Sequence, residues 1–154
     1  MPEFQPLLVL VPVVACPLAS RVLSGDRAFA DVYVEPAPLQ PPAWVFGPVW
    51  TILYALLGYA LALAAEAGPD TDPHALRDVV VLLTVNVLWT PLFLRRYTRA
   101  SLALLFFMVA QAAWVAGRNE PLRPYLAPYI LWLGFATFLN ADHAARPSQG
   151  TPDA

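Results

Sequence analysis

"PPAWVFGPVWTILYALLGYA" (residues 41–60) joins a cluster of proline, glycine and tryptophan to a long apolar run. The run places Trp44 and Trp50 six residues apart and continues without a charged residue until Glu66. An uncharged segment of about 20 residues, rising 1.5 Å per residue, spans the roughly 30 Å of hydrocarbon in a bilayer. The stretch therefore predicts a transmembrane helix whose first turns are rich in proline and tryptophan.

The composition of the whole chain also indicates a membrane environment. Hydrophobic residues make up 58% of the 154 residues and charged residues 13%, whereas soluble domains average about half apolar and a quarter charged. So short a chain cannot bury that much apolar surface in one aqueous core. The net charge of −2 leaves no basic footprint for nucleic acid, and the single cysteine excludes an internal disulfide or a multi-cysteine metal site.

Five apolar segments predict an all-α integral membrane protein, a bundle of five transmembrane helices. We expect helices at residues 5–23, 45–65, 75–94, 100–117 and 122–141, which form one membrane domain (1–141) followed by a polar C-terminal tail (142–154). Short connections make neighbouring helices antiparallel. The first segment has no basic residue before Arg21 and contains two prolines, so we expect a retained helix and not a cleaved signal.

The arginines predict the orientation. Six lie in or beside the first loop, the third loop and the tail, and three lie on the other side. The positive-inside rule then places the C-terminus in the cytoplasm. We expect the protein in the cell membrane of a bacterium or archaeon.

The second expected helix has an inward and an outward aromatic face. Trp44 and Trp50 lie on roughly opposite sides because six residues correspond to about 600° of rotation. Trp50 and Tyr54 are four apart and share a face. Trp44 suits either an interfacial aromatic belt or a ligand contact. Gly47 permits close approach to the backbone, and Pro48 is tolerated early in a helix.

The third expected helix carries "NVLWTPLF" (residues 86–93), which has a polar amide deep in the bilayer. Pro91 removes one backbone hydrogen bond from this helix. Asn86 either bonds a neighbouring helix beside the proline or lines a cavity with Trp89 and Phe93. The fifth expected helix leaves two similar alternatives open. Its Trp132, Ala136 and Asn140 lie on one stripe, which suits either a pocket wall or close helix packing.

Three blocks together resemble the TspO/MBR family, also called translocator or tryptophan-rich sensory proteins. They are residues 41–60, residues 86–93 and "PYILWLGFATFLN" (residues 128–140), and they occur in the family's order and spacing. The resemblance implies a five-helix bundle, usually a homodimer, with a pocket among the helices capped by the first loop. It implies binding of a tetrapyrrole such as protoporphyrin IX or haem, and in some members of a sterol or a drug-like molecule.

The resemblance also implies which residues form the pocket. Ligand contacts would come from Trp50, Tyr54, Asn86, Trp89, Phe93, Trp132, Leu133 and Ala136. The pocket mouth would be formed by Pro42, Trp44, Gly47 and Pro48. No catalytic residue, metal ligand or required cofactor is implied.

Two departures from the family pattern affect the function. The first loop reads "AFADVYVEPAPLQPP" (residues 28–42) and lacks the tryptophans and lysine of the family, with only Phe29 or Tyr33 to replace them. This weakens the case for porphyrin degradation. Ala141 stands where the sterol-recognition pattern needs a tyrosine, so sterol binding through that pattern is unsupported.

Three hypotheses for the function remain. The first is a membrane protein that binds, and transports or senses, an apolar planar ligand. The second is a photo-oxidative enzyme acting on porphyrin, for which the sequence offers no nucleophile–base pattern, since His74 and His143 lie outside the expected helices. The third is a regulatory or structural membrane partner with a degenerate pocket. The sequence favours the first.

Overall fold

The computed structural model describes residues 5–27, 39–66 and 71–145, with all their side chains except that of His143. The described residues form helices and no strands, so the predicted all-α class is confirmed. The elements are α1 (Pro6–Ser24), α3 (Ala43–Glu66), α4 (Ala75–Leu94), α5 (Thr98–Arg118), the short 3-10 turn η1 (Glu120–Leu122) and α6 (Arg123–Ala145). The first-loop positions Phe29 and Tyr33 lie outside the described residues.

Four of the described helices, α1, α3, α4 and α5, are long and apolar enough to cross a membrane. The fifth long helix of the described residues, α6, falls below this level of hydropathy. Its tyrosines, its prolines and Asn140 lower the average. It is nevertheless 23 residues long and packs along α3 and α5. The protein is therefore an integral membrane protein, and its described residues form five long helices.

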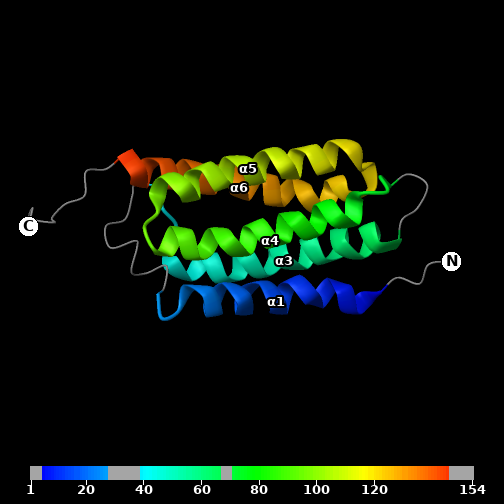
Figure 1. The fold of residues 1–154 in the computed structure, drawn as a ribbon, viewed down its shortest axis with the longest axis horizontal. Helices are drawn as coiled ribbons and strands as arrows, with labels where there is room; N and C mark the ends of the chain where they lie inside the picture. The colour runs from blue at the N-terminus through cyan, green and yellow to red at the C-terminus, as the bar shows by residue number, and fades with distance from the viewer. Residues whose placement is uncertain (1–4, 28–38, 67–70, 146–154) are drawn as a thin grey trace, which may run out of the picture.

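The helices form an antiparallel bundle, in which α1 lies at one edge and α5 and α6 lie at the other (Figure 1). The helix α1 packs against both α3 and α4. The helix α4 in turn packs against α5. The C-termini of α1, α4 and α6 lie at the same end as the N-termini of α3 and α5 (Figure 1). We call it the arginine end, after Arg21, Arg27, Arg95 and Arg99.

The bundle is apolar on the outside as well as within. The interior is filled by leucines such as Leu57, Leu82 and Leu105, which are fully buried. Residues of the outer faces such as Leu7 and Leu131 are each 76% exposed. Helices that are hydrophobic all round suit a lipid environment, where an apolar outer surface has no free-energy penalty.

Glycine sets the distance between α1 and α3. A Cβ atom built at Gly58 would lie 2.7 Å from Cα and 2.8 Å from the carbonyl carbon of Val9. Real Cβ atoms do not approach backbone atoms so closely. The two helices therefore touch backbone to backbone at this point, in the way that small residues permit between membrane helices.

A polar clamp closes the end of the bundle opposite the arginine end. The Asp72 carboxylate accepts a 2.8 Å hydrogen bond from the backbone N–H of His74 and a 2.7 Å bond from Nε of Arg118. Its own backbone N–H donates to the side-chain oxygen of Asn119 at 2.8 Å. These bonds fix the α3–α4 connection to the end of α5. The hydrogen bond from His74, followed by that from Arg118, lowers the pKa of Asp72 below its ordinary value.

The observed helix ends lie within a few residues of the predicted ones. The largest difference is at α6, which continues to Ala145 although the sequence predicted a polar tail from residue 142. Near this end, Asn140 is buried and donates a 3.0 Å hydrogen bond from Nδ2 to the hydroxyl of Ser101 on α5. A polar residue with a partner on the next helix does not end its own helix.

Candidate ligand-binding cavity

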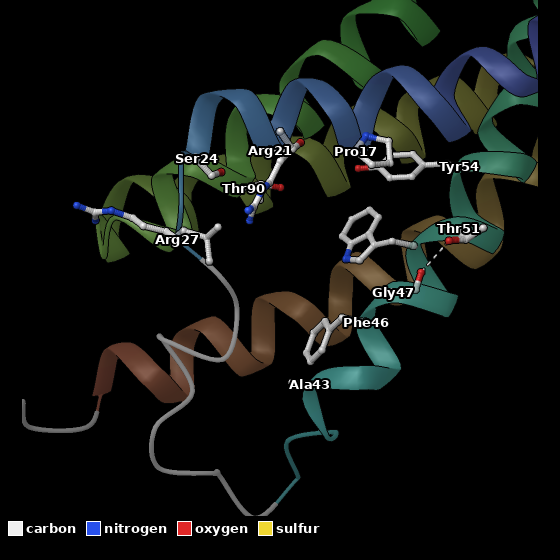
Figure 2. Close-up of a pocket in the computed structure, with 13 residues that line it drawn as sticks. Pro17, Arg21, Ser24, Arg27, Ala43, Phe46, Gly47, Thr51, Tyr54 and Thr90 are labelled. Carbon is white, nitrogen blue, oxygen red and sulfur yellow. Dashed lines mark hydrogen bonds between the residues drawn. The ribbon is translucent and has the colours of Figure 1, made fainter.

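A cavity of about 410 Å³ lies between α1, α3 and α4 at the arginine end of the bundle (Figure 2). Ligand pockets generally enclose roughly 300–1,000 Å³, so the volume suits a small molecule. Its lining comes from the last turns of α1, the first turns of α3 and the end of α4. The lining residues are Pro17, Ser20, Arg21, Ser24, Arg27, Ala43, Phe46, Gly47, Trp50, Thr51, Tyr54, Thr90 and Leu94.

The α3 wall of the cavity is aromatic. Phe46, Trp50 and Tyr54 follow one another at intervals of four residues, which places them on one face of a helix. The rings of Trp50 and Tyr54 lie 5.5 Å apart between centroids, tilted by 31°. This face offers flat apolar surface to anything in the cavity, and it contains both residues that the sequence predicted from this helix.

The α1 wall is polar. Pro17, Ser20, Arg21 and Ser24 follow the i, i+3, i+4, i+7 pattern of a single helix face. Figure 2 shows Pro17, Arg21 and Ser24 along α1, across the cavity from Phe46 and Gly47 on α3. Ser20 and Ser24 are buried, and Arg21 is exposed. The cavity is therefore amphipathic, with an aromatic and a hydrogen-bonding side.

A second set of rings supports the aromatic wall from behind. Trp132 of α6 meets Trp50 edge-on at 6.5 Å and Phe46 edge-on at 5.8 Å. Trp89 of α4 lies 6.4 Å from Trp50 and stacks on Phe93 at 5.1 Å. Trp89 and Trp132 therefore lie beside Trp50, with Phe93 stacked on Trp89, and none of the three lines the described cavity.

Asn86 lies beneath the cavity and connects three helices. Its side-chain oxygen accepts a 2.8 Å hydrogen bond from the hydroxyl of Tyr54 on α3. Its Nδ2 atom donates a 3.1 Å hydrogen bond to the hydroxyl of Tyr129 on α6. Of the two roles considered for Asn86, the structure shows bonding to neighbouring helices. The amide is 1% exposed, so it is absent from the cavity surface.

The remaining predicted site residues divide between the core and the outer surface. Leu133 and Ala136 are buried in the bundle and do not line the described cavity. Of the four predicted mouth residues, only Gly47 lines it. Trp44 is 74% exposed, which suits the alternative of an interfacial aromatic belt. Pro42 and Pro48 are also exposed.

Sequence reasoning missed the contribution of α1. The serines four residues apart, with Arg21 between them, formed a recognisable polar stripe at the end of an otherwise apolar helix. From the sequence, these serines were given no role, and Arg21 was used only for the orientation and for the absence of a basic segment before it. Phe46, Thr90 and Leu94 were missed as well, because their types are common in membrane helices and mark no site by themselves.

The described lining of the cavity carries three kinds of functional group. Its described lining holds aromatic rings, hydroxyl groups and guanidinium groups, and no carboxylate, histidine or cysteine. Across the described residues, no three His, Cys, Asp or Glu side chains lie close enough together to hold a metal ion. Cys16 is buried in α1 near this region as a free thiol.

Comparison with known proteins places this architecture in a family. The sequence model of the TspO/MBR family matches residues 8–145, from the first turn of α1 to the end of α6. The chain belongs to the TspO/MBR family. The predicted resemblance is thus confirmed.

This TspO/MBR protein has relatives in several kingdoms. It is 39% identical over 110 residues to the translocator protein homolog of Schizosaccharomyces pombe, covering 66% of this chain and 67% of that protein. It is 34% identical over 143 residues to the translocator protein of Homo sapiens, covering 85% and 82%. It is 32% identical over 120 residues to the tryptophan-rich sensory protein of Cereibacter sphaeroides, covering 75% and 74%.

Proposed function

We propose that this protein binds an apolar planar ligand in the cavity between α1, α3 and α4. The observation that supports this proposal is the row of Phe46, Trp50 and Tyr54 along one wall. Aromatic faces bind flat apolar molecules by stacking and by removing apolar surface from water. A preformed pocket that combines aromatic surface with placed polar groups is typical of small-molecule sites.

A tetrapyrrole such as protoporphyrin IX or haem is the ligand we favour within this class. The membership of the TspO/MBR family supports the choice, and so does the flat aromatic wall. The described lining has no histidine, cysteine or methionine, and the hydroxyl of Tyr54 already donates to Asn86. We therefore propose that the ring faces, and not an axial bond to iron, provide the binding energy. Transport or sensing would follow from this binding, and sterols or drug-like molecules are weaker candidates.

The proposed setting is a bilayer crossed five times. The 23 residues of α6 span about 34 Å at 1.5 Å per residue, enough for the hydrocarbon layer. Arg21, Arg27, Arg95 and Arg99 at one end support a cytoplasmic location for that end and for the C-terminus. We propose a homodimer in the cell membrane of a bacterium or archaeon, although relatives also occur in eukaryotes.

Titration of the purified protein with protoporphyrin IX tests the proposal. In phosphatidylcholine nanodiscs, tryptophan fluorescence should fall saturably as ligand is added. The variant Trp50→Ala should raise the apparent Kd by about 10-fold, since it removes the central ring of the aromatic wall. Trp114→Ala is the matched control, because Trp114 is 61% exposed on α5 and far from the lining. Quenching that rises linearly without saturation in the wild type would reject the proposal.

A further inference from the structure

The α1 wall contains two hydroxyl groups that lack the usual partner of a helical hydroxyl. Thr51, Thr84 and Thr137 each donate to the carbonyl four residues earlier, at 2.7–2.9 Å. Ser20 and Ser24 are 7% and 5% exposed, and their hydroxyl oxygens have no hydrogen-bond partner in the described structure. Buried polar groups are normally paired, so two orphans on the wall of a cavity point to a polar ligand group.

The two arginines of the cavity lining, Arg21 on α1 and Arg27 just after it, also have no partner among the described residues. Among the described residues, neither Arg21 nor Arg27 forms an ion pair or a side-chain hydrogen bond, and the described lining contains no carboxylate. Elsewhere, Arg95 donates to the carbonyl of Leu23, and Arg118 pairs with Asp72. The described lining thus combines two guanidinium groups without an ion pair and two hydroxyl groups without a hydrogen-bond partner among the described residues, and Arg21 and both serines lie on the side opposite the aromatic wall.

We propose that Ser20, Arg21 and Ser24 form an anion subsite that binds a carboxylate on the ligand while its ring system lies against α3. This inference rests on the proposed function, and it narrows the ligand to planar molecules with an acidic substituent. A guanidinium group binds a carboxylate with paired, charge-assisted hydrogen bonds. The two serine hydroxyls, one helical turn apart, add donors on either side of Arg21.

A lipid phosphate could supply the same chemistry, because arginines near membrane surfaces extend toward headgroups. The burial of the two serines favours a ligand inside the cavity, since a headgroup at the outer surface would not reach hydroxyls that are 5–7% exposed. We therefore assign the carboxylate of a bound ligand to this subsite. The experiment described next distinguishes a ligand carboxylate from a lipid phosphate.

The test compares protoporphyrin IX with its dimethyl ester, which keeps the ring and lacks the charges. Both are titrated into wild type, Arg21→Gln and Arg99→Gln in phosphatidylcholine nanodiscs. Wild type should bind the acid about 10-fold more tightly than the ester, as a hydrogen bond to a charged group predicts. Arg21→Gln should remove this preference and leave the ester affinity unchanged. Arg99→Gln, which removes the same charge from the same end outside the lining, should retain the preference.

A second variant covers the case in which Arg21→Gln folds poorly. Ser20→Ala/Ser24→Ala keeps good helix formers in α1 and should weaken acid binding several-fold without changing ester binding. Equal affinities of acid and ester in the wild type, as a lipid phosphate at Arg21 would give, overturn the subsite but leave the proposed function standing. If Arg21→Gln loses affinity for the acid and the ester equally, Arg21 has a structural role, and the proposed subsite is also overturned. If neither ligand saturates, both proposals fail.

Discussion

The hydroxyl of Tyr54 on α3 donates a 2.8 Å hydrogen bond to the side-chain oxygen of Asn86 on α4. The same amide donates to the hydroxyl of Tyr129 on α6 at 3.1 Å. Three helices therefore meet at one buried amide beneath the cavity floor. Tyr54 also lines the cavity, so the polar network fixes the position of a ring that we propose touches the ligand.

Asn86→Leu should destabilise the bundle because it removes the partner of two buried tyrosine hydroxyls. Leaving buried polar groups unpaired costs about 1–3 kcal/mol, and we expect the free energy of unfolding to fall by about that amount. Unfolding in sodium dodecyl sulfate, followed by circular dichroism, measures the change. Thr84→Val on the same helix is the control, because its hydroxyl bonds only within α4 and is exposed. Equal stability of both variants would show that the amide network contributes nothing.

Gly58→Ala should separate α1 from α3. The added Cβ would lie 2.7 Å from Cα of Val9, and the backbone of α1 must move to accommodate it. We expect a loss of about 1–3 kcal/mol, as for other overpacked sites, and a lower Tm in detergent. Gly134→Ala on α6 is the matched control, since no atom lies within 4 Å of its Cβ position. Alanine there should be neutral or stabilise the helix by about 0.5–1 kcal/mol. A Gly58→Ala variant with unchanged Tm would contradict the close contact.

Acid should open the clamp at Asp72. Hydrogen bonds from the His74 backbone and from Arg118 lower the pKa of this carboxyl in the folded state. A group whose pKa is lowered by folding stabilises the protein above its unfolded pKa, near 4 for aspartate. The contribution is therefore present at neutral pH and is lost as the pH falls below about 4 through the folded pKa.

Measurements of Tm between pH 7 and pH 3 test this linkage. Asp72→Asn should lower the Tm at pH 7 and should flatten its decline at acidic pH, because the titrating group is gone. Asp78→Asn removes the same charge from the neighbouring helix start, where Asp78 pairs only with its sequence neighbour Arg77 through a side-chain contact of 2.8 Å. Identical pH profiles for wild type and Asp72→Asn would contradict a role for this carboxylate in acid unfolding.

The helices were predictable because the bilayer requires long uncharged segments, and few other features produce them. The expected segment of residues 75–94 agrees with α4 at both ends. The end of α6 was less predictable, because the sequence becomes polar at Asp142 while the helix continues to Ala145. The buried Asn140 near this end bonds to Ser101 on another helix, and periodicity within one segment gives no information about such a partner.

Helical periodicity accounts for only one side of the cavity. The four-residue spacing of Trp50 and Tyr54 correctly placed both on one face, and both line the cavity. Periodicity shows which residues share a face but not which neighbouring helix that face meets. Trp89 and Trp132 belong to the same group of rings, yet their helices place them behind Trp50. The serines of α1 were missed for the same reason.

Trp132 should influence ligand binding only through the rings in front of it. It meets Trp50 edge-on at 6.5 Å and Phe46 at 5.8 Å, and it does not line the cavity. Such aromatic pairs are worth about 0.5–1.5 kcal/mol, so Trp132→Ala should weaken protoporphyrin IX binding by about 2- to 10-fold. Trp132→Phe keeps a ring and should weaken it less.

A double-mutant cycle separates this indirect effect from direct contact. If Trp132 only positions Trp50, then Trp132→Ala should add little once Trp50 has been replaced by alanine. Two residues that contact the ligand independently give additive losses, whereas residues acting through one another do not. Additive losses in the double variant would show that Trp132 reaches the ligand itself, and the cavity would then extend beyond Trp50 toward α6.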